Sequence, residues 1–256
     1  MEGIMRVRRL GWAGLEIESD GQTVVIDLVA EAKPLSSVLP EGALLPARPG
    51  AMAALCTHLH SDHADPAAIE QVLAEGGVVL RPKETNTAWT VQAEMCFAAR
   101  SLTVRIVQDW ETVTVGPFSI TAVPSVDGLG DPQVNWVVAA GGKRVFHGGD
   151  TVFHGYWWEI ADRCGPLDAA FLPINGATVN FPHLQPASPL PAVLTPEQAV
   201  VAGMILDARH VIPIHYGIEG QPAYVEVDDP IESLHIAAKQ YGVDILVAEP
   251  GVEISV

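Results

Sequence analysis

Short segments in which apolar residues alternate with polar ones, or continue without interruption, recur along the chain. Their lengths suit β-strands, and Ser19-Asp20-Gly21 between two of them is typical of a hairpin turn. Gly116-Pro117 and Gly141-Gly142 separate others. The predicted strands are Ile4–Leu10, Leu15–Glu18, Thr23–Leu28, Ala51–Thr57, Leu102–Val107, Thr112–Val115, Ser119–Val123, Val134–Ala140, Arg144–His147, Ala169–Pro173, Val211–Ile214 and Asp244–Val247.

Four further segments have the spacing or the start signals of helices. Asp65 is a candidate N-cap before Pro66, and Thr195-Pro196-Glu197 opens another helix, with Pro196 suited to the first helical position. Each half of the chain has strands first and strand–helix units afterwards, an order that suits two packed sheets with helices outside. We therefore expect a single α/β domain over residues 1–256. The predicted helices are one that begins at Pro66, Tyr156–Arg163, one from Thr195 to about Asp207, and Ile231–Tyr241.

The composition indicates a folded chain and limits the classes of partner that it can bind. Of 256 residues, 48% are apolar and 18% are charged, which is enough for a sizeable core. The 14 Lys and Arg against 31 Asp and Glu give a formal charge of −17. This charge works against nucleic acid or an anionic membrane surface as a partner, although a metal could still attract a small anionic substrate. No apolar segment is long enough to span a membrane.

Cysteine use favours a reducing compartment. Cys56, Cys96 and Cys164 are far apart, odd in number and form no CxxC pair, so neither a disulfide framework nor a thiolate zinc site is predicted. We expect them to be buried apolar residues, and we expect the protein to be cytoplasmic.

The strongest chemical pattern follows the predicted strand Ala51–Thr57. His58-Leu59-His60-Ser61-Asp62-His63 offers three imidazoles and a carboxylate at spacings that can converge on one or two nearby positions. Borderline divalent ions bind these groups. The alternative is a solvated loop that merely contains histidines, but chance would give this pattern in roughly one such chain per thousand. We therefore predict a metal site.

Three motifs together resemble the metallo-β-lactamase superfamily, whose members share a four-layer αββα sandwich of two mixed β-sheets flanked by helices. They are Thr57–His63, Gly149-Asp150-Thr151 after one predicted strand and Pro213-Ile214-His215-Tyr216 after another. Leu172–Gly176 and Leu194–Ala199 are also similar to the branch that contains ascorbate-6-phosphate lactonases and N-acylphosphatidylethanolamine phospholipase D-like hydrolases.

The resemblance implies a centre with two divalent metal ions, which are zinc, manganese or iron. Carried over residue by residue, it implies that Asp150 bridges both ions, that Asp62 and Asp150 are the catalytic residues, and that a hydroxide between the ions attacks the substrate. The implied ligands are His58, His60 and Asp127 for the first ion, and Asp62, His63 and His215 for the second.

Two positions depart from the family pattern. Asp127 stands where a third histidine normally completes the first metal site. A carboxylate there can still bind and would favour a harder ion such as Mn²⁺ or Fe²⁺. Alternatively, the first site is weaker, or His154 or His183 fills it from elsewhere. Trp12 replaces a common histidine, so we expect it to line the pocket or fill the core and the site to have one polar interaction fewer.

Other candidate residues have structural interpretations beside functional ones. Asp27 either accepts a hydrogen bond from a ligand histidine or caps a turn, and the sequence leaves both open. His147 is expected to be structural, and His210 and His235 to lie at the surface. The aromatic run Tyr156-Trp157-Trp158 is expected in the core or at an interface.

The leading functional hypothesis is a metal-dependent hydrolase that acts on a small ester, lactone or phosphodiester. The second is a binding or regulatory protein with this fold and a weakened first metal site. Nucleic-acid processing and β-lactam hydrolysis are both disfavoured. The loops Glu31–Gly50, Phe181–Leu194 and Gly217–Asp229 are expected to set specificity without naming a substrate, and a homo-oligomer stays open.

Overall fold

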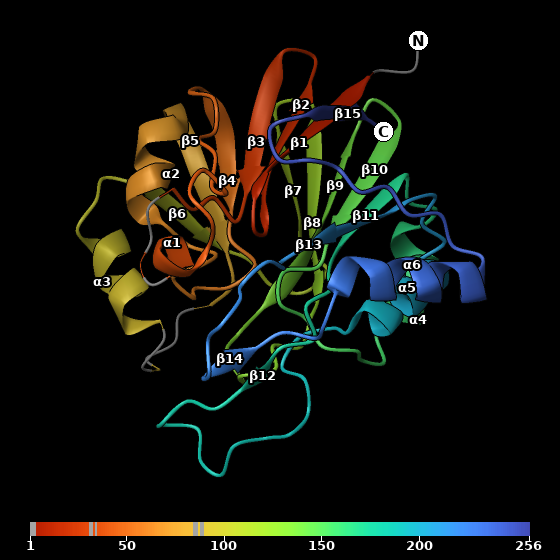
Figure 1. The fold of residues 1–256 in the computed structure, drawn as a ribbon. Helices are drawn as coiled ribbons and strands as arrows, with labels where there is room; N and C mark the ends of the chain where they lie inside the picture. Colours follow the sequence, from red (N-terminus) through yellow and green to blue (C-terminus); the bar gives the residue numbers. More distant parts are fainter. Residues whose placement is uncertain (1–3, 31–32, 34, 84–86, 88–89) are drawn as a thin grey trace.

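Two β-sheets face each other, and helices cover their outer faces (Figure 1). The computed structural model describes residues 4–30, 33, 35–83, 87 and 90–256. The first sheet has the order β15-β1-β2-β3-β4-β5-β6 and the second β13-β11-β10-β9-β8-β7, with a small pair β12-β14 beside them. The strands are β1 (Met5–Gly11), β2 (Gly14–Ser19), β3 (Gln22–Ile26), β4 (Ala51–Leu55), β5 (Leu73–Arg81), β6 (Thr103–Ile106), β7 (Thr112–Val115), β8 (Phe118–Pro124), β9 (Val134–Ala140), β10 (Lys143–His147), β11 (Ala169–Pro173), β12 (Thr178–Val179), β13 (Val211–Ile214), β14 (Tyr224–Val225) and β15 (Glu253–Ser255).

Each large sheet begins antiparallel and ends parallel. Strands β1, β2 and β3 pair antiparallel, and β3 to β6 continue in parallel. In the second sheet β7 to β10 pair antiparallel, and β10, β11 and β13 are parallel. Consequently β1, β3, β4, β8, β10 and β13 all end at the same edge of the sandwich, which positions whatever side chains follow them.

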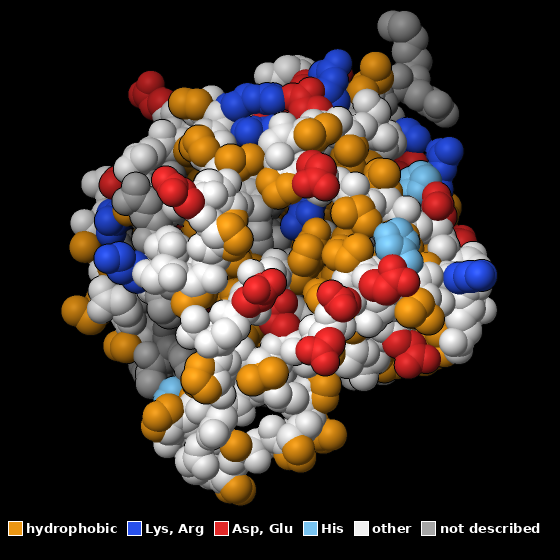
Figure 2. Space-filling model, in the orientation of Figure 1, with side chains coloured by type: hydrophobic (Ala, Val, Ile, Leu, Met, Phe, Trp, Pro, Cys, Tyr) orange, Lys and Arg blue, Asp and Glu red, His pale blue; other side chains and the backbone are white. Residues whose placement is uncertain are grey.

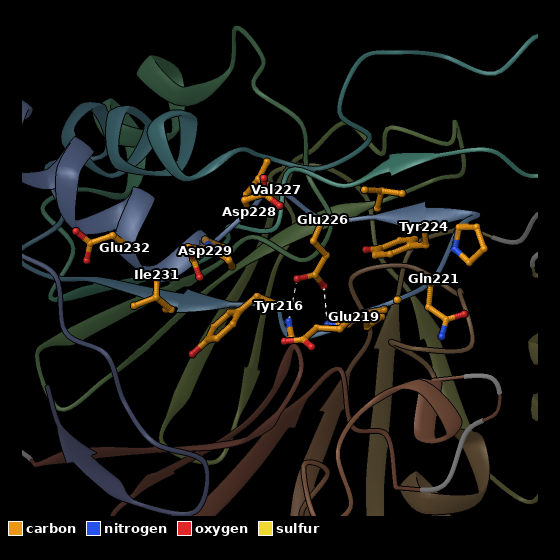
Figure 3. Close-up of a pocket in the computed structure, with 16 residues that line it drawn as sticks. Tyr216, Glu219, Gln221, Tyr224, Glu226, Val227, Asp228, Asp229, Ile231 and Glu232 are labelled. Atoms are coloured by element: carbon orange, nitrogen blue, oxygen red, sulfur yellow. Dashed lines mark hydrogen bonds between the residues drawn. The ribbon is translucent and has the colours of Figure 1, made fainter.

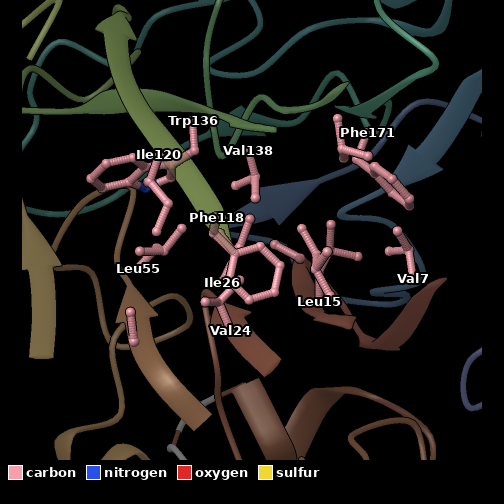
Figure 4. Packing of buried hydrophobic residues seen from close by; sticks show 14 of the residues in the cluster. Val7, Leu15, Val24, Ile26, Leu55, Phe118, Ile120, Trp136, Val138 and Phe171 are labelled. Carbon is pink, nitrogen blue, oxygen red and sulfur yellow. The ribbon is translucent and has the colours of Figure 1, made fainter. Parts of the chain in front are cut away.

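Apolar side chains from the two sheets meet in the middle (Figure 4). The first sheet contributes Val7, Leu15, Ile26 and Leu55, and the second contributes Phe118, Ile120, Trp136, Val138 and Phe171. Trp136 and Phe118 are completely buried. The large apolar area that these side chains remove from water holds the two sheets together.

Helices pack on the outer faces of the sheets. Ile69 and Phe97 from two helices join Val79 in a cluster on the outside of the first sheet, and a second cluster on the other sheet includes Trp157 and Leu234. These layers confirm the predicted αββα sandwich. The helices are α1 (Leu35–Val38), α2 (Pro66–Val72), α3 (Val91–Ala98), α4 (Trp157–Cys164), α5 (Pro196–Ile205) and α6 (Pro230–Tyr241).

Helix α5 begins at Pro196, as the sequence predicts, and Thr195 is its N-cap. The Thr195 hydroxyl accepts a hydrogen bond from Gln198 N, and the Gln198 side chain accepts one from Thr195 N, so a complete capping box forms. We expect Thr195→Ala to lower the free energy of unfolding by about 1 kcal/mol, because one backbone N–H of the first turn loses its acceptor. Chemical denaturation of both proteins measures this, and Thr195→Ser, which keeps the hydroxyl, should restore most of the loss.

Some elements differ from the sequence-based prediction. Asp244–Val247 does not form a strand, since only Ile245 makes an isolated bridge to Val211. The last strand is instead β15, a short and largely exposed edge strand beside β1. The prediction also lacked β5, which contains Gly76-Gly77, and α3.

The lengths of the helices and the state of the cysteines complete the description of the fold. Among the described residues no helix has the length and apolar character that crossing a membrane requires. The three cysteines are free; Cys56 is buried as expected, whereas Cys96 and Cys164 are partly exposed.

Candidate metal centre

The residues of the three motifs meet at the edge where the parallel strands end. His58, His60, Asp62 and His63 follow β4, Asp150 follows β10, and His215 follows β13. Among the described residues, potential ligand atoms fall into three groups, each with its members within 4.8 Å of one another. These are Asp62, His63, Asp150 and His215; His58, His60 and Asp150; and His60, Asp127 and Asp131.

Asp150 lies at the centre of the first two groups. Its Oδ1 is 2.8 Å from His63 Nε2 and 2.7 Å from His215 Nε2, and its Oδ2 is 4.0 Å from His58 Nε2. Asp62 Oδ2 lies 3.5 Å from His63 Nε2 and 3.7 Å from His215 Nε2. Among the described residues, Asp150 alone belongs to both the Asp62 group and the His58 group.

The donor set fits divalent ions. Within the described part of the chain, Nε2 of His58, His63 and His215 and Oδ1 of Asp150 are buried and make no hydrogen bond of normal geometry, although Asp150 Oδ1 lies 2.8 Å and 2.7 Å from the His63 and His215 nitrogens. Buried polar atoms normally have partners, so convergent atoms without them mark a place for a ligand. Imidazole nitrogens with carboxylate oxygens are the combination that zinc, manganese and iron bind.

Charges around the centre favour ionised carboxylates. Burial opposes ionisation of Asp150, but His215 and His63 outweigh burial and hold the Asp150 pKa well below its usual value. Burial likewise opposes protonation of His63, yet Asp150, Asp62 and Asp27 together hold its pKa well above the usual value. Burial, with His63 and His60 nearby, lowers the pKa of His58 and keeps that ring neutral. Ionised carboxylates and neutral imidazoles are the forms that bind metals, so Asp150 and His58 are ready to bind, whereas His63 would release its proton when an ion binds.

Asp27 fixes the ring of His63. Its buried carboxylate lies 2.8 Å from His63 Nδ1 and accepts hydrogen bonds from Thr57 N at 2.8 Å and Thr57 Oγ1 at 2.7 Å. Of the two interpretations that the sequence left open, the structure therefore shows contact with a histidine of the motif. Such contacts orient ligand histidines and set their tautomer.

Asp131 does the same for His60, and the sequence analysis missed it. Asp131 Oδ2 is 2.8 Å from His60 Nε2 and also accepts a hydrogen bond from Thr87 Oγ1. With Asp131 at Nε2, Nδ1 of His60 is the nitrogen that would bind an ion. No motif marks Asp131; it reaches His60 because the Asp127–Asp131 turn folds back on the site, with Asp127 Oδ2 accepting from Asp131 N at 2.8 Å.

Asp127 belongs to a group with His60 and Asp131, but not to the group that contains His58 and Asp150. Burial raises its pKa. Its carboxylate has a structural task in closing the turn, which leaves its part in metal binding as a prediction. The next residue in this turn is Gly128. A Cβ at that position would stand 2.0 Å from the backbone oxygen of Ala192, so a larger residue does not fit.

Trp12 differs from the expectation that the site has one polar interaction fewer. Its indole Nε1 donates a hydrogen bond to Asp62 Oδ2 at 3.1 Å, and its ring lies 4.0 Å from the His215 ring. The backbone of Trp12 has a φ of 46°, which turns the indole toward the site. Trp12 therefore lines the pocket as expected and also supplies a polar contact.

The other histidines are outside the ligand groups of the described residues. His147 is structural, as predicted, with Nε2 2.8 Å from Ala13 O and Nδ1 accepting from Gly149 N. His154 stacks on Trp157 at 4.2 Å, and burial lowers its pKa to about 4. His183 stacks on Phe181. Neither His154 nor His183 joins a ligand group.

The contact at Asp131 leads to a test. We expect Asp131→Asn to weaken metal retention by ~10–100-fold at the His60 group, because an amide orients the imidazole less strongly than a carboxylate. The Asp62, His63 and His215 group should keep its ion. Competition with a chelating dye measures both affinities; equal weakening at both places would mean that Asp131 acts on the fold instead.

Known proteins resemble the chain over almost its whole length. A relative from Thermococcus kodakarensis, described as a UPF0173 metal-dependent hydrolase, is 26% identical over 98% of this chain and 99% of its own. A solved structure from Parabacteroides distasonis, described as a putative metal-dependent hydrolase, has a TM-score of 0.68 and 22% identity, covering 96% of this chain and 93% of its own. The diiron β-hydroxylase CmlA from Streptomyces venezuelae has a TM-score of 0.70 and 19% identity, over the whole of this chain and 54% of its own.

A family model matches the residues that carry the site. It is described as the beta-lactamase superfamily domain and covers residues 12–216, from Trp12 beside the centre to the residue after His215. With the sandwich of two sheets and the donor groups at its edge, this match confirms the superfamily, while the branch suggested by the sequence stays a prediction. The chain belongs to the beta-lactamase superfamily.

Proposed function

We propose that the protein is a metal-dependent hydrolase that uses two divalent ions to cleave a small ester, lactone or phosphodiester. The observation that carries the proposal is the pair of neighbouring donor groups that share Asp150. Relatives described as metal-dependent hydrolases over almost the whole chain support it. Because the first sheet supplies one part of the donors and the second sheet the other, we also propose that residues 1–256 act as one domain.

In this proposal His58, His60 and Asp127 hold the first ion, whereas Asp62, His63 and His215 hold the second, with Asp150 bridging both. Zinc, manganese or iron suits these ligands. A carboxylate at Asp127 favours the harder ions, and CmlA, a diiron enzyme of similar fold, supports iron as an occupant.

The chain's own groups prepare this chemistry. Bound ions of this kind lower the pKa of a coordinated water toward ~7 and polarise a carbonyl or phosphoryl oxygen. Asp27 and Asp131 hold two of the imidazoles in place. The Trp12 indole N–H donates a hydrogen bond to Asp62. Asp62 and Asp150 both line a cavity beside the centre. Fixed ligand positions reduce the reorganisation that the reaction needs.

Metal analysis and a substrate panel test the proposal together. We expect close to two ions per chain after loading with Mn²⁺ or Zn²⁺, and turnover of at least one ester, lactone or phosphodiester. His60→Ala should lose both an ion and turnover. If His60→Ala keeps full metal content and activity, the proposed centre is wrong.

One observation favours a second candidate, a binding or regulatory protein. Asp127 contacts the turn and lies in the His60 group rather than with His58, so the first site has fewer clear donors than the second. This candidate predicts at most one ion per chain after loading and no turnover on the whole panel.

A further inference from the structure

A cavity of about 260 Å³ opens beside the metal centre. Asp62, Asp150 and His60 form one side of it, and the remaining lining residues are mainly apolar. The uncharged polar residues among them are Ser61 and Gln221. The apolar and aromatic lining residues are Trp12, Leu35, Val38, Leu129, Phe181, Ile218, Ala223 and Tyr224.

Hydrogen bonds hold one apolar wall of this cavity in place. The carboxylate of Glu226 accepts from Gly217 N and Ile218 N, each at 3.0 Å, and Figure 3 shows it reaching across to that backbone. The Tyr224 hydroxyl accepts a hydrogen bond from Asn175 Nδ2 at 2.8 Å. The segment that carries Ile218, Gln221 and Tyr224 is therefore fixed before any ligand arrives, as in most small-molecule sites.

No Lys or Arg side chain lines the cavity among the described residues. All 14 Lys and Arg belong to the described part of the chain, because the remaining residues include none. Many are paired on other elements, such as Arg8 with Glu16, Arg81 with Glu94 and Lys143 with Asp168. Lys33, two residues before Leu35, is exposed and is not a lining residue. Sites that hold carboxylates or phosphates normally use Arg or Lys.

Negative charge surrounds the same wall on its other side. A larger cavity of about 1090 Å³ shares Ile218, Gln221 and Tyr224 with the first one but touches none of the metal-site residues. Its acidic lining residues are Glu219, Glu226, Asp228, Asp229 and Glu232. Figure 2 shows Asp and Glu gathered in this region, whereas most Lys and Arg lie at the upper edge and the sides of the molecule. Two divalent ions would carry four positive charges, which the carboxylates of Asp62, Asp127 and Asp150 and one hydroxide would balance. The acidic residues of this wall therefore set the field that an approaching anion meets, and that field is repulsive.

We propose that the substrate is an uncharged ester or lactone that presents an apolar group of about one ring to the smaller cavity. A cavity of ~150 Å³ encloses benzene, so 260 Å³ has room for a ring with a short chain. The inference rests on the proposed hydrolase function and narrows it, since it excludes phosphodiesters and substrates with a remote carboxylate.

The reaction itself agrees with this charge pattern. Water adds across the ester bond: its oxygen goes to the acyl carbon, the acyl C–O bond breaks, and the leaving oxygen takes a proton. A neutral ester therefore yields an alcohol and a carboxylic acid, and the acid ionises at neutral pH. The surrounding carboxylates attract neither substrate nor product, but they repel the ionised product and favour its release.

A matched pair of esters tests the inference on the metal-loaded protein. Methyl phenylpropanoate is neutral, and the same ester with a carboxylate in the para position differs only by a charge remote from the reacting carbon. We expect kcat/KM to be at least ~10-fold higher for the neutral ester, the scale of one unfavourable charge contact. Equal or faster turnover of the charged ester would overturn the inference.

Binding separates failure of the inference from failure of the proposed function. Phenylpropanamide and its para-carboxylate are not expected to be hydrolysed, and calorimetry measures their binding directly. If none of the esters, lactones and phosphodiesters of the panel is turned over but the neutral amide still binds more tightly, the hydrolase proposal fails and the cavity assignment stands. If the charged amide binds as tightly as the neutral one, the cavity assignment is wrong.

A charge placed in the cavity wall provides the sharpest variant. Gln221→Arg adds a cation beside the cavity. It should lower the ratio of kcat/KM for the neutral ester to that for the charged ester about tenfold. Gln240→Arg makes the same change in net charge on the exposed end of α6, away from the lining residues, and should leave the preference unaltered. Equal effects of both variants would show that overall charge, rather than this cavity, sets the preference.

Discussion

Asp150→Ala is expected to remove the metal centre. Among the described residues, Asp150 alone is shared by the Asp62 and His58 donor groups, and its carboxylate oxygens approach three imidazole rings. Without it, each group loses its common anionic donor. We expect fewer than one retained ion per chain and a fall in turnover of at least ~10³-fold, because metal stabilisation of a transition state contributes several kcal/mol.

Elemental analysis and initial rates measure the two effects of this substitution. Asp162→Ala is a matched control, because Asp162 is an exposed aspartate on α4 outside every ligand group of the described residues. Asp150→Asn keeps the shape of the side chain and should also lose metal, which separates loss of the ligand from loss of packing. Retention of two ions and full turnover by Asp150→Ala would refute the bridging role.

Asp27→Asn is expected to have the second largest effect. Asp27 is completely buried at its side chain and receives three contacts, two from Thr57 and one from His63. An amide cannot accept all of them, so one buried donor loses its partner, at a cost of ~1–3 kcal/mol in the free energy of unfolding. Because His63 also loses its orienting carboxylate, we expect ~10–100-fold weaker binding of the second ion.

The variant at Asp131 is the natural comparison for Asp27→Asn. Both substitutions replace a buried carboxylate beside a motif histidine, but one acts at His63 and the other at His60. Metal titration should therefore show weakening of different sites in the two proteins. If both variants weaken the same site, the division of the donors into two groups is incorrect.

The layers and the place of the centre could be predicted because they follow from local patterns. Strands such as β11 are apolar runs bounded by turn residues, and Asp65 and Thr195 cap helices by short-range hydrogen bonds. The motif histidines follow strands whose ends meet at one edge, so their order along the chain was sufficient to place them near one another.

Other features depend on contacts between distant segments, which local patterns do not contain. β15 is short and exposed, and it becomes a strand only because the edge of β1 is available to it. Asp131 has no motif and reaches His60 through a turn that Asp127 closes. The indole of Trp12 donates to Asp62, 50 residues further along the chain, from a backbone position with a positive φ that the sequence does not reveal.

Each sheet supplies only part of the metal donors, so a cut in the chain between the two sheets would separate the donors. The segment Gln108–Glu111 lies between β6 and β7, so a break there leaves His58, His60, Asp62 and His63 on one fragment and Asp150 and His215 on the other. Neither fragment alone holds a complete donor group of the Asp62 or His58 kind. A divalent ion would then hold the two fragments together by binding donors from both. The fraction of reassembled fragments would therefore rise with the concentration of the ion.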